Sequence, residues 1–247
     1  MDPARGMLAT HQLQGPGLRL VVADGVPLDW ARDAWRLVGC FATAGCLARF
    51  ELPLPDEGAY AVVKPCTPRT WWPPGRRLMP CRAVREGRGL VEVSRWNLPA
   101  VPLLFWGEER FAGLVRYGAV ATRRLDAPPC HEAWRQSGDP AILEGVVDEL
   151  AALHAAGLAH GDAALRNWLW TPPRPTVLDL ASWSRLNPST RARDLLRLLA
   201  SILWVTGSTA TARQLLGRYS SRELFPLADP ESLLRQAAER AAAKGRG

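Results

Sequence analysis

Lysine is scarce in this chain of 247 residues, although the chain is strongly basic. Of its 31 Lys and Arg residues only Lys64 and Lys244 are lysines, and 24 Asp and Glu residues leave a formal net charge of +7. Arginine presents a planar fork of donors, whereas lysine presents a compact point charge. A lone interior lysine in this background indicates that Lys64 performs a task for which arginine is poorly suited. The alternative is a solvated charge at the end of a strand.

The chain also lacks the long apolar runs and paired cysteines that are typical of other protein classes. No apolar run approaches the roughly 20 residues that a membrane span needs. Residues 1–17 lack the apolar core of a signal peptide, so we expect a cytoplasmic protein. The cysteines form no CxxC pair and accompany no His cluster, which argues against a disulfide framework and a zinc site. We expect buried, inert thiols at all five positions: Cys40, Cys46, Cys66, Cys81 and Cys130.

The positive charge is concentrated in residues 64–95, which hold eight basic and two acidic residues. A basic segment attracts nucleotides, phosphorylated sugars, nucleic acid and anionic lipid alike, so it does not select among them. The segment also holds two tryptophans beside three arginines: Trp71, Trp72, Arg69, Arg76 and Arg77. These side chains predict either a patch that binds an acceptor or a membrane surface, or ordinary packing of a loop.

Extended patterns dominate the first half of the chain. Residues 1–28 are polar and rich in glycine, which predicts an irregular start with one short apolar run, LRLVVA. Residues 47–64 predict a hairpin around PDEG that ends at Pro65. We expect a loop over residues 65–80, a helix over 82–95, a linker over 97–102, and strands over 103–106 and 113–122.

Helical patterns dominate the second half. We expect helices over residues 144–156, 191–205, 209–219 and 230–244, with Gly157 ending the first of them and a short strand, TVLDL, between the first two. The chain is therefore predicted to be an α+β protein of two lobes. The N-lobe would span residues 1–122, with a β-sheet and one helix. The helical C-lobe would span residues 123–247, with a hinge over 123–126.

Residues 160–167, HGDAALRN, and residues 177–180, VLDL, carry the chemistry. Asp162 and Asn167 stand five residues apart, and Asp179 follows a short strand. Phosphoryl transfer from a magnesium nucleotide needs one carboxylate to orient the attacking hydroxyl, and oxygen ligands for the metal. This spacing therefore favours a kinase. The alternative for Asp162 alone is a helix cap.

HGDAALRN resembles the catalytic loop of protein-kinase-like enzymes, H-R-D-x-x-x-x-N. LDLAS resembles their metal-binding D-F-G segment, and AVVK resembles the strand that ends in the phosphate-pairing lysine. LHAAGLAHGD, NWLW and VLDL are similar to segments of lipopolysaccharide core kinases, which phosphorylate Kdo or heptose. The resemblance covers about residues 45–205. It implies a protein-kinase-like two-lobed fold and ATP-dependent phosphorylation of a sugar hydroxyl on the lipopolysaccharide core.

The resemblance also implies a role for each motif residue. Asp162 would be the catalytic base, and Asn167 and Asp179 would bind Mg²⁺. Lys64 would contact the ATP phosphates and Glu86 would pair with Lys64. ATP and Mg²⁺ are therefore the expected cofactors.

For Glu86, His160 and Asp194, a structural explanation remains open beside the functional one. Glu92 lies on the same predicted helix as Glu86, and an ordinary surface salt bridge would explain either residue. His160 is better explained as a packed structural histidine than as a proton shuttle. Asp194 resembles the helix aspartate that braces the catalytic loop, but a helix dipole also favours an acid in the first turn.

The chain departs from the protein-kinase pattern in three places. Gly39 and Gly45 flank CFATA where a glycine-rich phosphate loop would lie, which is a poor match. Gly161 stands in place of the usual arginine. Only eleven residues separate Asp179 from Arg191, and no A-P-E motif follows, so little room remains for docking a peptide. We therefore expect a small-molecule or lipid-linked sugar acceptor and no nucleic-acid partner, with peripheral contact at the inner membrane.

Other functions remain open at this point. An aminoglycoside phosphotransferase-like small-molecule kinase also uses an HGD loop. A small atypical Ser/Thr protein kinase would share the same motifs. A nucleotide-binding pseudokinase is favoured by the poor glycine loop and disfavoured by the intact motif residues. Similarity of fold cannot decide the acceptor.

Overall fold

The computed structural model describes residues 10–15, 17–45, 48–56, 58–68, 73–222 and 229–244. The chain forms two compact units. The first comprises Met1–Asn97 with Val101–Leu125, and the second comprises Leu98–Ala100 with Asp126–Gly247. None of the helices in these described ranges is both long and apolar enough to cross a bilayer.

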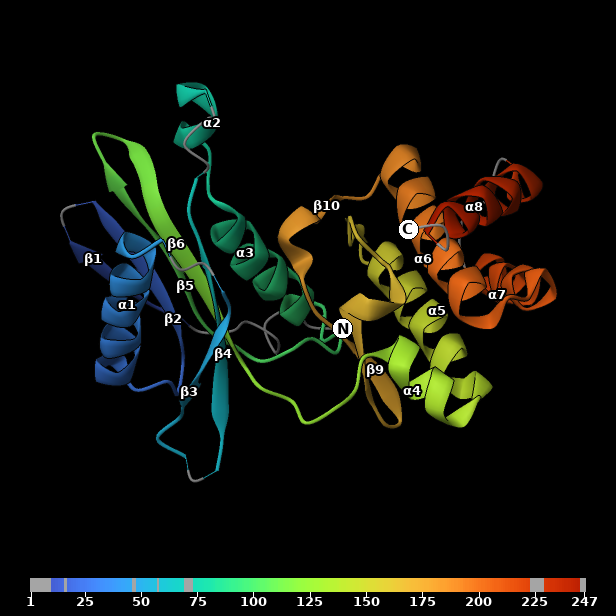
Figure 1. The fold of residues 1–247 in the computed structure, drawn as a ribbon, viewed down its shortest axis with the longest axis horizontal. Coiled ribbons are helices and arrows are strands. Elements are labelled where there is room, and N and C mark those ends of the chain that lie inside the picture. Colours follow the sequence, from blue (N-terminus) through green and yellow to red (C-terminus); the bar gives the residue numbers. More distant parts are fainter. Residues whose placement is uncertain are drawn as a thin grey trace. The chain divides into compact units, whose positions relative to one another are not determined.

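The first unit is built on a six-stranded antiparallel sheet in the order β1-β2-β5-β6-β4-β3 (Figure 1). Its strands are β1 (Thr10–Gly15), β2 (Leu18–Ala23), β3 (Phe50–Pro53), β4 (Tyr60–Cys66), β5 (Leu103–Phe111) and β6 (Leu114–Arg123). Its helices are α1 (Leu28–Thr43), α2 (Pro74–Leu78) and α3 (Arg82–Arg95).

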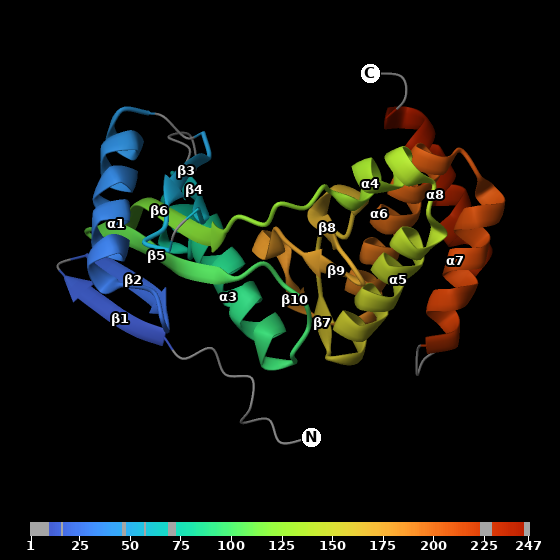
Figure 2. The same ribbon diagram turned by 90° about the horizontal axis from the view of Figure 1, so that it is seen from below.

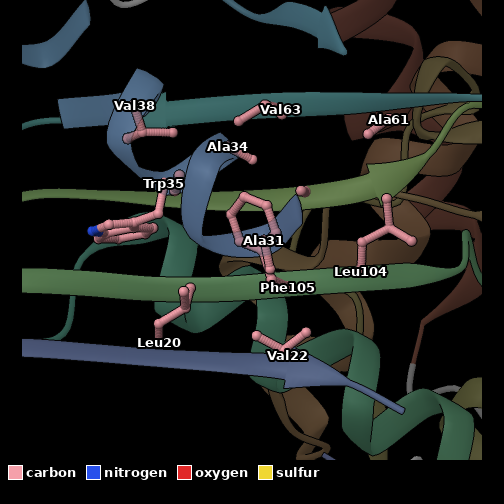
Figure 3. Close-up of a cluster of buried hydrophobic side chains, with 12 residues drawn as sticks. Leu20, Val22, Ala31, Ala34, Trp35, Val38, Ala61, Val63, Leu104 and Phe105 are labelled. Carbon is pink, nitrogen blue, oxygen red and sulfur yellow. The ribbon is translucent and has the colours of Figure 1, made fainter. Parts of the chain in front are cut away.

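Helix α1 covers one face of this sheet and buries an apolar cluster there. Trp35 of the helix packs edge-on against Phe105 of β5, with ring centroids 6.4 Å apart. Figure 3 shows this helix packed against the sheet, and the labelled side chains there are Leu20, Val22, Ala31, Ala34, Trp35, Val38, Ala61, Val63, Leu104 and Phe105. Burial of this apolar area is the main source of stability for the first unit.

Helix α3 packs on the opposite face of the sheet. Successive residues of a strand point to opposite sides of a sheet, so neighbouring residues of one strand contact different helices. Phe105 faces α1, so its neighbour Trp106 faces α3. A Cβ atom added at Gly87 of α3 would lie 2.2 Å from Cγ of Trp106. By the same alternation, Val63 of β4 faces α1 and Lys64 faces α3. The pleat of β4 therefore directs the lysine toward α3.

The second unit is mainly helical and carries two small sheets (Figure 2). Its helices are α4 (Cys130–Ser137), α5 (Pro140–Ala155), α6 (Pro188–Thr206), α7 (Thr209–Arg222) and α8 (Pro230–Lys244). Strand β7 (Leu158–Ala159) pairs with β10 (Ser184–Arg185), and β8 (Trp168–Thr171) pairs with β9 (Arg174–Val177). Two short 3₁₀ helices are η2 (Leu165–Asn167) and η3 (Leu180–Ser182).

Local capping fixes where the helices around the motif begin and end. The side chain of Asp139 accepts a hydrogen bond from the Ala141 N–H and starts α5. Asn187 and Thr190 form a capping box at the start of α6. After α5, Gly157 adopts φ 76°, a left-handed conformation that glycine takes at little steric cost. The loop that follows therefore leaves the helix in a defined direction.

The α+β fold class is confirmed, and several elements match the predicted ranges. Helix α3 has the predicted bounds, and the three later helices contain their predicted ranges. The prediction of an irregular start was wrong for the described residues between Thr10 and Ala23, because β1 and β2 form a hairpin there and β2 pairs with β5. The sequence analysis also missed α1 and α4, and it missed α2, which lies inside the predicted loop over residues 65–80.

Two smaller predictions were also wrong. Pro65 does not end its strand, since β4 continues to Cys66. Among the four cysteines described as free thiols, only Cys130 is fully buried, while Cys40 is exposed. Burial raises the pKa of the Cys130 thiol to about 12, so this thiol is inert at neutral pH.

Gly87 gives a test of how closely α3 approaches the sheet. Gly87→Ala would gain about 1 kcal/mol of helix propensity. It would also place a methyl group inside the base of the Trp106 side chain, where overpacking costs about 1–3 kcal/mol. We expect a net loss of stability, measured as a lower urea midpoint of the unfolding transition.

The matched control is Gly217→Ala in α7, where an added Cβ meets no atom within 4 Å. This variant should gain stability, because only the helix-propensity effect remains. A Gly87→Ala protein as stable as the Gly217→Ala protein would contradict the close approach of α3.

Candidate active site

In the first unit, Lys64 and Glu86 form an ion pair. The Lys64 Nζ atom lies 2.7 Å from Glu86 Oε1, with the lysine side chain 29% exposed and the glutamate side chain 3% exposed. The pair borders a cavity of about 200 Å³. Glu92 pairs instead with Arg95 on the surface of the same helix. Geometry therefore selects Glu86 as the lysine's partner, as the sequence analysis expected.

In the second unit, the buried carboxylate of Asp194 holds the start of the catalytic loop. It accepts hydrogen bonds from the backbone N–H groups of His160 (2.7 Å) and Gly161 (2.8 Å). The Nε2 atom of His154 also lies 3.4 Å from Asp194 Oδ2. Because α6 begins at Pro188, Asp194 lies beyond the first turn, so the helix dipole does not explain it. Asp194 braces the loop.

Gly161 is required by close packing, and this accounts for the absent arginine at its position. The residue has φ 84°, which non-glycine residues rarely adopt. An added Cβ would lie 2.0 Å from the Ser182 carbonyl oxygen. The η3 segment therefore lies directly against the loop, and no side chain fits between them.

Asp162 is held between two arginines. Arg166 donates to its Oδ2 at 2.6 Å, and Arg197 donates to its Oδ1 at 2.8 Å. Arg197 also donates to the Gly161 carbonyl at 2.7 Å. Partial burial by itself raises the pKa of Asp162, but the two guanidinium groups outweigh that effect and hold the pKa below its usual range. The carboxylate is therefore ionised at neutral pH.

Asn167 and Asp179 are tied to one another through the backbone. The Asn167 side-chain nitrogen donates to the Asp162 carbonyl at 2.7 Å. The Leu178 N–H donates to the Asn167 carbonyl at 3.1 Å, which fixes the residue before Asp179. Asp179 itself adopts φ 55° and ψ 58°, a strained conformation for a residue with a Cβ. One amide and one carboxylate thus supply the oxygen donors that Mg²⁺ prefers.

His160 is fully buried and packs against Trp168, with ring centroids 5.5 Å apart. Burial lowers its pKa, so the ring is neutral. The Asp162 N–H lies 3.4 Å from its Nδ1. These contacts favour a structural histidine that supports the loop.

The structure accounts for one departure from the kinase pattern and leaves one site prediction untested. Gly39 lies inside α1, so CFATA forms the end of a helix, in line with its poor match to a glycine-rich phosphate loop. The predicted patch around Trp71 and Trp72 falls outside the described residues, together with Arg69 and the side chain of Arg76.

Sequence analysis did not identify Arg166 or Arg197 as neighbours of Asp162. Arg166 lies inside the HGDAALRN motif, at a position where the kinase pattern sets no residue type. Arg197 follows Asp194 by three residues, which places both side chains on one face of α6. That spacing is the only sequence signal for its position. The roles of Lys64, Glu86 and the loop residues stay predictions.

Comparison with known families identifies the class of protein. The phosphotransferase enzyme family, APH, matches residues 50–234, which is more than half of the chain. The chain therefore belongs to this family and is a kinase. Comparison with curated proteins gives no match.

Two solved structures resemble the whole fold. WaaP in complex with acyl carrier protein has a TM-score of 0.61 and 19% identity, covering 91% of this chain and 98% of that chain. An aminoglycoside-3'-phosphotransferase of type VIII has a TM-score of 0.55 and 13% identity, covering 78% of this chain and 88% of that chain. These similarities confirm the protein-kinase-like fold class.

The loop packing gives a prediction at Gly161. In Gly161→Ala, the new methyl group overlaps the Ser182 backbone, so the loop and η3 must separate. We expect a loss of thermal stability and a loss of most phosphotransfer activity.

Gly157→Ala is the control, because Gly157 has a similar φ of 76° but nothing within 4 Å of an added Cβ. It should cost about 1–2 kcal/mol from backbone strain alone and retain activity. Equal effects of the two substitutions would show that φ, and not the contact with Ser182, requires glycine at 161.

Proposed function

We propose that this kinase transfers the γ-phosphoryl group of ATP, with Mg²⁺, to a sugar hydroxyl, and that the sugar belongs to the lipopolysaccharide core. The observation that carries this proposal is the arrangement of Asp162 and Asn167 on one braced loop, with Asp179 tied to it through Leu178. Phosphoryl transfer depends mainly on positioning and charge stabilisation, and a rigid loop supplies the positioning.

Asp162 would orient the acceptor hydroxyl and accept its proton. Its lowered pKa keeps it ionised, which suits an orienting carboxylate in a loose transition state. Each of its oxygens accepts from an arginine, so an acceptor hydroxyl must compete with a guanidinium group for the carboxylate. Arg197 is anchored twice, whereas Arg166 is 51% exposed and makes a single ion pair. Arg166 is therefore the side chain expected to move.

Asn167 and Asp179 are the residues that would hold Mg²⁺. The metal would neutralise charge on the phosphates during transfer. In the first unit, Lys64 would contact the phosphates of ATP, and Glu86 would keep the ammonium group in place through their 2.7 Å ion pair. A point charge on a buried partner fits this task better than a planar guanidinium group does.

The choice of acceptor rests on the sequence segments that resemble lipopolysaccharide core kinases. An aminoglycoside carries several positive charges, and the two arginines beside Asp162 would repel it. The basic segment over residues 64–95 would favour anionic partners and peripheral contact with an anionic membrane face. We therefore place the protein in the cytoplasm, with contact at the inner membrane.

The test is phosphate transfer from labelled ATP to a panel of core oligosaccharides, aminoglycosides and a generic protein substrate. We expect transfer to core sugars only. Asp162→Asn should lose at least about 100-fold in turnover while keeping Mg-dependent ATP binding by calorimetry, because the change preserves shape but removes the proton acceptor. Near wild-type turnover in this variant would exclude Asp162 as the base. Transfer restricted to aminoglycosides would exclude the sugar assignment.

Lys64→Arg tests the argument from lysine scarcity. We expect the apparent KM for ATP to rise and turnover to fall, because the guanidinium group cannot reproduce both the pairing with Glu86 and the point charge at the phosphates. Lys244→Arg, near the end of α8, is the control for loss of a lysine and should behave like the wild type. Full activity in Lys64→Arg would refute a special role for Lys64.

A further inference from the structure

Three arginines surround Asp162 in a single pocket of the second unit. The pocket has a volume of about 240 Å³ and is lined by Asp162, Ala164, Arg166, Arg197 and Arg240. The arginines come from three different elements, η2, α6 and α8. Because they are far apart in the sequence, their meeting at the proposed catalytic carboxylate is a product of the tertiary fold.

The pocket carries more positive charge than Asp162 can compensate. Arg197 is fixed by two hydrogen bonds, to Gly161 O and to Asp162 Oδ1. Arg166 uses the remaining carboxylate oxygen, Oδ2. Arg240 is the third guanidinium group of this pocket, and no hydrogen bond or ion pair joins it to Asp162 or to another described residue. Guanidinium groups bind carboxylates and phosphates through paired hydrogen bonds, so this surplus favours an anionic ligand.

We propose that this pocket is a subsite for an anionic group, a carboxylate or a phosphate, on the sugar acceptor. The inference rests on the proposed sugar kinase function and adds the means of selecting the acceptor. Arg240 meets the anion first, because it is exposed at the edge of the pocket. Arg166 then exchanges its ion pair with Asp162 for one with the acceptor.

This exchange links acceptor binding to the state of the catalytic carboxylate. While Arg166 donates to Asp162 Oδ2 at 2.6 Å, its positive charge and its hydrogen bond compete with an acceptor hydroxyl for that oxygen. An acceptor anion draws Arg166 away and leaves Oδ2 to the hydroxyl, while Arg197 keeps Oδ1 in place. A neutral sugar offers Arg166 no competing partner, so Asp162 stays covered. Arg166 is therefore a positioning residue, and Arg240 determines specificity.

An adjoining cavity offers room for the uncharged part of the acceptor. It has a volume of about 270 Å³ and shares Ala164 and Arg166 with the cationic pocket. Its other walls include Trp204 and His131, and burial lowers the pKa of His131 so that the ring is neutral. Arg166 thus lies where an uncharged cavity meets a cationic one, as recognition of an acidic or phosphorylated sugar requires.

The experiment compares three matched probes with the full chain and Mg–ATP: galactose, galacturonate and galactose 6-phosphate. We expect kcat/KM for one or both anionic sugars to exceed that for galactose by at least about tenfold. A preference for galacturonate identifies a carboxylate site, and a preference for galactose 6-phosphate identifies a phosphate site. Equal use of all three sugars would overturn the inference.

Arg240→Gln should raise the KM for the preferred anionic sugar about tenfold and leave the KM for ATP and the use of galactose unchanged. Arg235→Gln is the matched control, since Arg235 is exposed on the same helix but does not line the pocket. Arg166→Gln removes the side chain that covers Asp162, whichever sugar is bound. The ratio of turnover with the anionic sugar to turnover with galactose should therefore fall. An Arg240→Gln protein that loses affinity for ATP as much as for the sugar would also overturn the inference.

Calorimetry with the same sugars separates this inference from the proposed function. Binding of an anionic sugar that Arg240→Gln weakens would support the pocket even without phosphate transfer, and the panel of core oligosaccharides then tests the sugar kinase proposal separately. Transfer to galactose and to the anionic sugars with equal efficiency would support the kinase proposal and refute the pocket. Absence of binding to both anionic sugars would refute the pocket.

Discussion

The carboxylate of Asp194 holds the HGDAALRN loop of the second unit in place. It is completely buried, and it accepts the two consecutive N–H groups that begin the catalytic loop. A buried charge is costly unless it is paired or hydrogen-bonded, so this carboxylate and the loop depend on each other. Because Asp194 and Arg197 stand on the same helix, α6 fixes both the start of the loop and the position of Asp162.

Each unit also depends on one glycine that permits close packing within that unit. Gly161 leaves room for the Ser182 carbonyl against the loop, and Gly87 leaves room for Trp106 against α3. The contact between Gly161 and Ser182 packs η3, the segment after Asp179, against the HGDAALRN loop. The contact between Gly87 and Trp106 seats the helix that carries Glu86, within its own unit, against the sheet that carries Lys64. Close packing at a glycine therefore positions the motif residues within each unit.

The charged neighbours of Asp162 determine which acceptors its pocket favours. In the proposed function Asp162 is the catalytic carboxylate, and fold alone does not decide the acceptor. The guanidinium groups of Arg166 and Arg197 lower its pKa and occupy its oxygens. Specificity can then be set by the partner that competes for Arg166, without any change in the catalytic residue.

The sequence by itself determined the fold class, most helices of the second unit and the motif residues, because periodicity and short spacings are local signals. It did not determine the hairpin over residues 10–23, whose second strand pairs with β5, about 80 residues later. The close packing that requires glycine at 161 and the placement of Arg240 and Asp162 in one pocket were also decided only by the tertiary structure. Each depends on contacts between segments that are distant in the chain, and no local pattern records which of many arginines or glycines will face which neighbour.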